Sequence, residues 1–199
     1  MSLQFFESVI LHRRTIKPQL MNGRKIDDAI VTHILNLADW APTHGHTEPW
    51  RFFVFSGEGV AQFCTDHANL YKTNTTEATF LTANYEKLRL MGDKASHLIA
   101  VAMKRGNNPK IPVKEEIAAV CCSIQILLLA AHVHGLAAYW GTGGMTYHTS
   151  MKDYFGLEEQ DHMVGFIYLG YTDATKTGSR IVPLGQKIKW MGRLSESGE

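Results

Sequence analysis

The amino-acid sequence predicts an α+β fold in which a sheet is flanked by helices. Four short apolar runs are typical of strands, and the segments between them repeat apolar residues at helical spacing. The chain has 199 residues, a length that suits one domain with a sizeable core. We find no internal repeat and no linker between two cores, and we therefore expect one domain over residues 1–199.

The composition favours a cytoplasmic protein whose partners are small molecules. A net charge of +1 gives no indication of nucleic acid or an anionic membrane as a partner. The cysteines are Cys64 and the adjacent pair Cys121-Cys122, without a C-x-x-C, so structural zinc is not expected and a reducing compartment fits best. The N-terminus lacks a basic leader, and we expect no signal peptide.

The first quarter of the chain predicts two amphipathic helices. Ser2 is a suitable N-cap for a helix that runs to His12. A second helix starts at Asp27 or Asp28 and should end at Ala41, because Pro42 disfavours helical geometry in the residue before it.

The middle of the chain alternates strands and helices. The aromatic run after Trp50 predicts a buried strand, and helical spacing resumes through Phe63 towards Tyr71. The Thr-rich segment 73–79 should be a mobile loop, and another helix should pass through Tyr85 to Met91. Residues 98–103 predict a second strand, followed by a loop over 105–114.

The longest apolar run, Ile117 to Val133, predicts a helix that is apolar on all sides. Such a helix must be covered on all sides, either at the centre of the domain or in a subunit interface. Interrupting polar residues and the absence of a second span favour a buried helix over a membrane span. Gly135 is a candidate C′ cap.

The last third predicts two strands around a glycine-rich turn. A strand over 136–140 breaks at Gly141-Thr142-Gly143-Gly144, a short helix follows over 149–155, and residues 161–171 form the last core strand. The turn lacks the G-x-G-x-x-G pattern, so a Rossmann site is rejected. A tight turn and a close backbone approach to a ligand both stay open.

Arg13-Arg14-Thr15 has two interpretations of equal weight. It is either a solvated basic turn at a helix C-terminus or a phosphate clamp, because guanidinium groups match phosphate oxygens and a hydroxyl adds a donor. No metal site is indicated, since the ten histidines include no H-E-x-x-H and no pairing with cysteine. No hydrolase signature occurs either.

The stretch Trp40 to Phe55 resembles the signature of the nitroreductase family of flavin enzymes, which is A-P, a few polar residues, then Q-P-W-R-F. Here Ala41-Pro42 and Pro49-Trp50-Arg51-Phe52 match, while Glu48 replaces the family's Gln and His46 stands where Asn is common. The order of the motifs, including the early R-R-S-like turn and the V-G-F strand, extends the resemblance over nearly the whole chain.

The resemblance implies a central, mainly antiparallel sheet and a homodimer with FMN at the interface. It assigns the phosphate to Arg13, Arg14 and Thr15, with Arg180 as a second phosphate ligand or an ordinary surface arginine. Main-chain groups of the glycine-rich turn, at Gly141, Thr142 and Gly143, would contact the flavin. The side chains of Trp40 and His44 would border it. For His44 and His46 the alternative is a solvated turn residue.

The implied activity is that of an FMN-dependent oxidoreductase. Hydride would pass from NADH or NADPH through FMN to a nitroaromatic, quinone or other electron-poor acceptor, and no side chain needs to act as a nucleophile. A specialised oxidase, dehalogenase or flavin-cleaving enzyme, a flavin-binding protein without turnover, and a helical scaffold remain alternatives. The acceptor and the choice between NADH and NADPH do not follow from the sequence.

Overall fold

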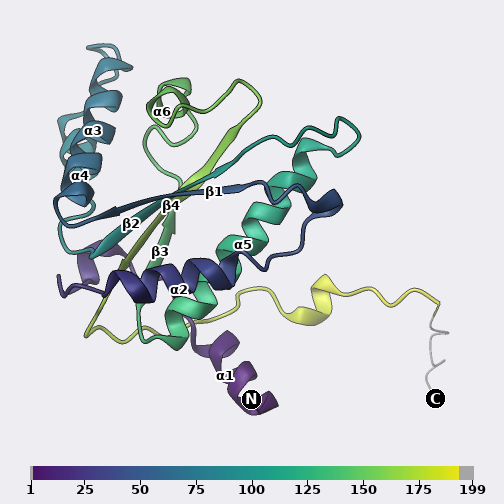
Figure 1. Ribbon diagram of the computed structural model, residues 1–199. Coiled ribbons are helices and arrows are strands. Elements are labelled where there is room, and N and C mark those ends of the chain that lie inside the picture. Colours follow the sequence, from purple (N-terminus) through teal and green to yellow (C-terminus); the bar gives the residue numbers. More distant parts are fainter. Residues whose placement is uncertain (1, 193–199) are drawn as a thin grey trace.

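The computed structural model describes residues 2–192, which form a four-stranded sheet flanked by helices (Figure 1). The strand order is β1-β2-β4-β3, and every neighbouring pair is antiparallel, as predicted. The strands are β1 (Trp50–Ser56), β2 (His97–Met103), β3 (Ala137–Gly141) and β4 (His162–Gly170). The inner strands β2 and β4 are buried almost throughout, whereas β3 lies at an edge.

Helices cover both faces of the sheet, and strand alternation gives each face its own core. The helices are α1 (Leu3–His12), α2 (Asp28–Ala38), α3 (Glu58–Thr73), α4 (Thr82–Arg89), α5 (Val113–Val133) and α6 (Thr149–Tyr154), with short 3-10 helices η1 (Pro18–Leu20), η2 (His44–His46) and η3 (Leu184–Lys187). Ile99 and Ile167 pack with α2 and α5 on one face. Leu98 and Phe166 pack with α3 and α6 on the other.

The predicted helix starts are confirmed by capping hydrogen bonds. Ser2 Oγ accepts from the Phe5 amide at 3.2 Å, and Asp27 Oδ1 accepts from the Ala29 amide at 2.8 Å. The helix α2 ends at Ala38, three residues before the predicted Ala41, because the chain tightens into turns ahead of Pro42.

The long apolar helix begins at Val113, two residues before the predicted opening pair Glu115-Glu116. Pro112 occupies the N-cap position of α5, where its missing amide hydrogen is not needed, and Glu115 and Glu116 follow in the first turn. Gly135 follows the end of the helix with φ +71, as expected of a C′ glycine. The Thr-rich segment 73–79 is a loop, as predicted, except that its first residue, Thr73, is the last residue of α3.

The helix α5 is covered on one side within the described chain. By length and composition alone it could cross a membrane, but half of its most apolar stretch is buried in the core. An uncovered stripe at helical spacing remains exposed or half-exposed; it consists of Ala118, Cys122, Gln125, Leu129 and Val133. The helix is therefore a buried core helix, as expected, with one face that the described chain leaves uncovered.

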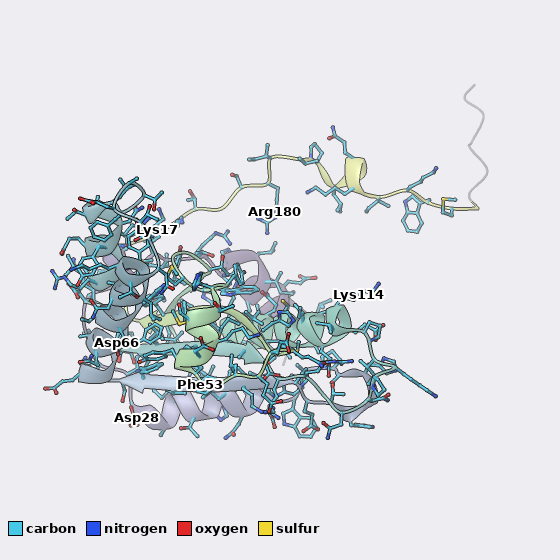
Figure 2. All side chains as sticks on the ribbon, turned by 90° about the horizontal axis from the view of Figure 1, so that it is seen from above. Lys17, Asp28, Phe53, Asp66, Lys114 and Arg180 are labelled. Carbon is cyan, nitrogen blue, oxygen red and sulfur yellow. The ribbon has the colours of Figure 1, made fainter. Side chains whose placement is uncertain are left out.

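Both ends of the described chain also expose apolar side chains. The helix α1 has no buried residue, and its Phe5, Phe6 and Ile10 are about half exposed. The C-terminal segment 172–192 leaves the body of the molecule and exposes Ile181 and Trp190 (Figures 1 and 2). These surfaces are unusual for a chain that stays alone in water.

Gly165 is required where β4 meets the side chain of Trp140. The register of β2 and β4 shifts beside Gly165, whose φ is +147. A Cβ there would lie 2.3 Å from Trp140 Nε1, and this indole donates to Val164 O at 3.2 Å. The glycine thus allows the indole to cross the strand.

We predict that Gly165→Ala lowers the free energy of unfolding by about 1–3 kcal/mol, because the new methyl group overpacks this crossing. Urea unfolding measures the loss. Gly156→Ala is the matched control, since Gly156 also has a positive φ but nothing lies within 4 Å of its Cβ position. Equal losses in both variants would show that backbone strain, and not the indole contact, requires the glycine.

Candidate functional site

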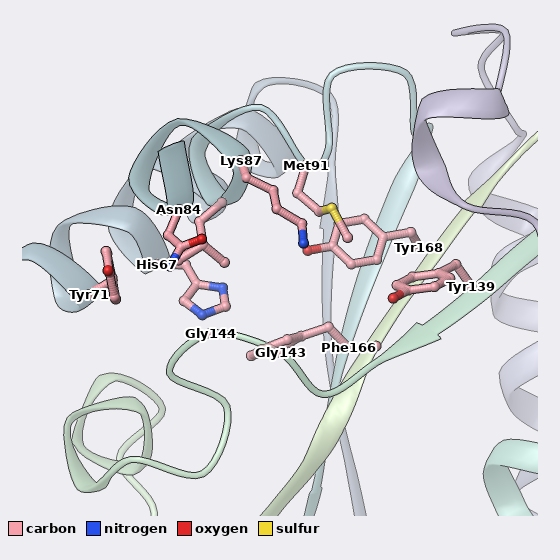
Figure 3. Close-up of a pocket in the computed structure, with 12 residues that line it drawn as sticks. His67, Tyr71, Asn84, Lys87, Met91, Tyr139, Gly143, Gly144, Phe166 and Tyr168 are labelled. Carbon is pink, nitrogen blue, oxygen red and sulfur yellow. The ribbon is translucent and has the colours of Figure 1, made fainter. Parts of the chain in front are cut away.

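A cavity of about 240 Å³ lies between the helices α3 and α4 and the edge of the sheet at β3 (Figure 3). Its floor consists of Tyr139 from β3 with Phe166 and Tyr168 from β4. Tyr139 pairs with Tyr168 in the sheet, so both side chains point to the same face, and their ring centroids are 6.2 Å apart. A floor of aromatic rings suits a flat, partly apolar ligand.

The glycine-rich turn after β3 forms one rim of this cavity. Gly141, Gly143 and Gly144 line it, and the Cβ position of Gly143 has no neighbour within 4 Å. Gly144 has φ +65, and a Cβ there would lie 2.5 Å from His67 Nε2. The turn therefore exposes its main chain to the cavity beside Gly143 and is closely packed at Gly144.

His67 of α3 holds this turn from the opposite side. The imidazole is 3% exposed, and its Nε2 accepts a hydrogen bond from the Met145 amide at 2.8 Å. Burial lowers the pKa of His67 to about 4, so the ring is neutral near pH 7. Lys87 of α4 is a cationic group that also borders the cavity.

The arginine turn gathers positive charge without a carboxylate partner in the described chain. Arg14 Nη1 donates to Arg13 O at 2.8 Å, and Arg14 Nε is fully buried with no hydrogen-bond partner. The pKa of Arg13 is lowered, first by burial and then by the positive charges of Arg14 and Arg180. An anion placed here would relieve the repulsion and satisfy the unpaired donor.

The C-terminal segment closes over the same turn. Gly178 lies so near that an added Cβ would be 2.4 Å from Arg14 Nε. Lys176 Nζ donates to Thr15 O at 2.9 Å, and Arg180, which projects from this segment, shares a cavity of about 200 Å³ with Arg14 (Figure 2). The structure thus places Arg13, Arg14, Thr15 and Arg180 near one another.

The strand β3 joins the arginine turn to the cavity. Thr15 forms a parallel bridge with Ala138 on the free edge of β3, and the Ile16 amide donates to Ala138 O at 3.0 Å. Gly141 is three residues further along the strand, about 10 Å away. A ligand with a phosphate at one end and a flat ring at the other can therefore lie along β3.

Trp40 and His44 lie elsewhere in the same chain. Trp40 is 87% exposed, and His44 Nδ1 is 2.7 Å from Glu115 Oε2 in the first turn of α5. Arg13 faces His132 in the last turn of that helix, where burial and then Arg13 lower the pKa of His132. Since the 21 residues of α5 span about 30 Å, one chain does not bring these residues to the arginine turn.

His67, Tyr139 and Tyr168 were not among the predicted site residues. Strand geometry places Phe166 and Tyr168 on the same face of the last strand, but it does not tell which face of the sheet borders a cavity. His67 had no sequence signal, because its partner Met145 is 78 residues away. Among residues 2–192 no group of three or more histidine, cysteine, aspartate or glutamate residues is placed to hold a metal.

Comparison with known proteins identifies the family. Residues 10–171 match the Nitroreductase family, and the chain belongs to it. YdjA of Escherichia coli K12, which has the provisional name of an NAD(P)H nitroreductase, is 30% identical over 151 residues, 76% of this chain and 80% of YdjA. YfhC of Bacillus subtilis, provisionally named in the same way, is 27% identical over 92% of each chain.

Solved structures show the same fold. A nitroreductase-like family protein from Bacillus cereus superposes with a TM-score of 0.80 and 25% identity, over 97% of this chain and 99% of that one. The FMN-dependent nitroreductase NfnB from Mycobacterium smegmatis, solved in complex with NADPH, gives a TM-score of 0.70 at 17% identity, over 94% and 98%. The second likeness concerns the fold alone.

We predict that burial of His67 makes stability depend on pH. An unfolded histidine has a pKa near 6.5, whereas His67 has one of about 4 in the folded chain. Between pH values of about 6.5 and 4 the unfolded chain binds a proton at this histidine and the folded chain does not. The free energy of unfolding therefore falls as the pH falls, by at most about 1.4 kcal/mol per pH unit.

Denaturant unfolding at pH 7 and pH 4.5 tests this, with His67→Phe removing the effect and His33→Phe, a change at an exposed histidine of α2, leaving it in place. The same pH slope in wild type and His67→Phe would contradict the assignment.

Proposed function

We propose that the chain is an FMN-dependent oxidoreductase that takes electrons from NADH or NADPH and passes them to a nitroaromatic, quinone or other electron-poor acceptor. The observation that carries the proposal is the arginine turn without a countercharge, joined by β3 to a cavity with an aromatic floor. The relatives provisionally named NAD(P)H nitroreductases support the same activity.

The residues present fit FMN at both ends. Arg13, Arg14, Thr15 and Arg180 would hold the phosphate, with the buried Arg14 Nε as a donor that needs an acceptor. Main-chain groups of Gly141, Thr142 and Gly143 would face the ring, and Tyr139 and Tyr168 would lie beneath it. FMN supplies the redox chemistry when bound, and the protein contributes position and electrostatics.

An anaerobic assay tests the activity directly. The purified chain, loaded with FMN, should oxidise NADH or NADPH only when a nitroaromatic or quinone acceptor is present. Rapid bleaching of the flavin by the nicotinamide, with no turnover on any acceptor, would indicate a specialised enzyme of the same family. A chain that binds FMN without reacting with NADH or NADPH would refute the proposed donor.

We predict that Arg13→Ala weakens FMN binding about ten- to a hundredfold, since a charge-assisted hydrogen bond to phosphate contributes about 1.5–3 kcal/mol. Fluorescence titration of the apo-protein measures the affinity. Riboflavin, which lacks the phosphate, should bind the variant and the wild type equally. Lys17→Ala, which removes a neighbouring exposed cation, is the matched control. Equal losses for FMN and riboflavin would refute the phosphate role.

The same proposal places the flavin at the interface of a homodimer. The uncovered stripe of α5, the exposed apolar side chains of α1 and those of the C-terminal segment would be covered by a second copy. Trp40 and His44 lie too far from the arginine turn of their own chain, so they would border the flavin of the other copy. His44 would then influence the ease of flavin reduction.

We predict that Ala118→Arg converts a dimer into monomers, because it puts a charge into the stripe without disturbing the core of one chain. Sedimentation at micromolar concentration compares it with Ala61→Arg, a change on the exposed face of α3, which should leave the dimer intact. A wild-type chain that sediments as an FMN-loaded monomer would overturn the shared site.

A further inference from the structure

The buried imidazole of His67 has a fixed tautomer. Its Nε2 accepts the hydrogen bond of the Met145 amide at 2.8 Å, and an amide nitrogen can only donate. Nε2 therefore carries no proton, and a neutral ring must have its hydrogen on Nδ1. The rings of Phe63 and Phe166, whose centroids lie 5.9 and 5.3 Å from that of His67, hold the imidazole in place.

The second nitrogen of this ring is a donor without an acceptor. Among the described residues the hydrogen bond of this ring is the one at Nε2, and the fully buried side-chain donor that lacks a partner is Arg14 Nε. The ring is 3% exposed and forms part of the cavity wall above the glycine turn (Figure 3). His67 lines the cavity, so an acceptor atom of a ligand there would pair with this donor in place of water.

We propose that His67 is a cofactor-binding residue whose Nδ1–H donates to a carbonyl oxygen or ring nitrogen of the flavin. The inference rests on the proposed function, because it takes the flat ligand of the cavity to be the flavin ring. The same imidazole binds the turn through Nε2 and the ligand through Nδ1. His67 would therefore fix the distance between the Gly143-Gly144 main chain and the flavin ring.

A neutral donor at this place also affects the reduction potential. Reduction increases the negative charge on the oxygens and nitrogens of a flavin, so a hydrogen bond to one of them favours the reduced form. Lys87 borders the same cavity and would act through its full charge, which salt can screen. The contribution of His67 is directional and should persist at high salt.

Nitrogen NMR tests the tautomer before any flavin is added. Histidine ring spectra of the nitrogen-15-labelled apo-protein at pH 7 should show His67 with a protonated Nδ1 and an unprotonated Nε2. Saturating FMN should shift the Nδ1 resonance far more than Nε2. A protonated Nε2, or an Nδ1 resonance that FMN leaves unmoved, overturns the proposal.

Two substitutions then test the consequence for binding. His67→Phe removes both hydrogen bonds and should weaken FMN affinity about three- to tenfold and lower the flavin midpoint potential. The amide group of His67→Gln can still accept from the Met145 amide and donate to the flavin ring. This variant should therefore keep most of the wild-type FMN affinity and midpoint potential. His33→Phe, a change at an exposed histidine of α2 that does not line the cavity, is the matched control and should alter neither.

The outcomes separate this inference from the proposed function. A wild-type chain that does not bind FMN refutes both. FMN binding with the same affinity and potential in wild type and His67→Phe refutes the role of His67 alone. Equal losses in His67→Phe and His67→Gln, with FMN still bound by both, would show that a side-chain donor at this position does not bind the flavin, which also overturns the proposal.

Discussion

The site depends on the free edge of β3. This strand has β4 on one side and only the short bridge of Thr15 to Ala138 on the other. The bridge holds the arginine turn at the start of the strand, while the glycine turn leaves its end. Because β3 is extended, the spacing between the two turns is fixed by its rise per residue. If Thr15 were not paired here, the cationic turn and the aromatic cavity would not share one ligand.

Positive charge at the arginine turn costs stability in the chain alone. Arg14 and Arg180 repel Arg13, and the partial burial of Arg13 reduces the water that would screen this repulsion. Elsewhere the fold pairs its buried charges, as in Arg105, whose guanidinium donates to Glu116 and to Ile111 O. The contrast suggests that the unpaired cluster is kept for a ligand. The same reasoning applies to the unpaired donor Arg14 Nε.

Local signals in the sequence predicted local structure well. Ser2, Asp27 and Gly135 act at helix ends as expected, because capping involves residues a few positions apart. The four strands were predicted from their apolar runs. The pairing of His67 with Met145 joins distant segments, and no local pattern encodes it. The cluster of Arg13 with Arg180 was suggested by family resemblance, since spacing alone does not bring those segments together.

The position of η2 relates the candidate site to the proposed homodimer. His44 and Glu115 fasten this segment to the first turn of α5, and the arginine turn lies beside the last turn of the same helix. A two-fold axis across the uncovered stripe of α5 would set the two helices antiparallel or crossed, so that the first turn of one helix approaches the last turn of the other. The η2 segment and the arginine turn, which lie at opposite ends of α5 in one chain, would then meet each other across the two chains. An apolar stripe is suited to that role, because residues near the two-fold axis would face their own symmetry mates, and a charge there would meet a like charge.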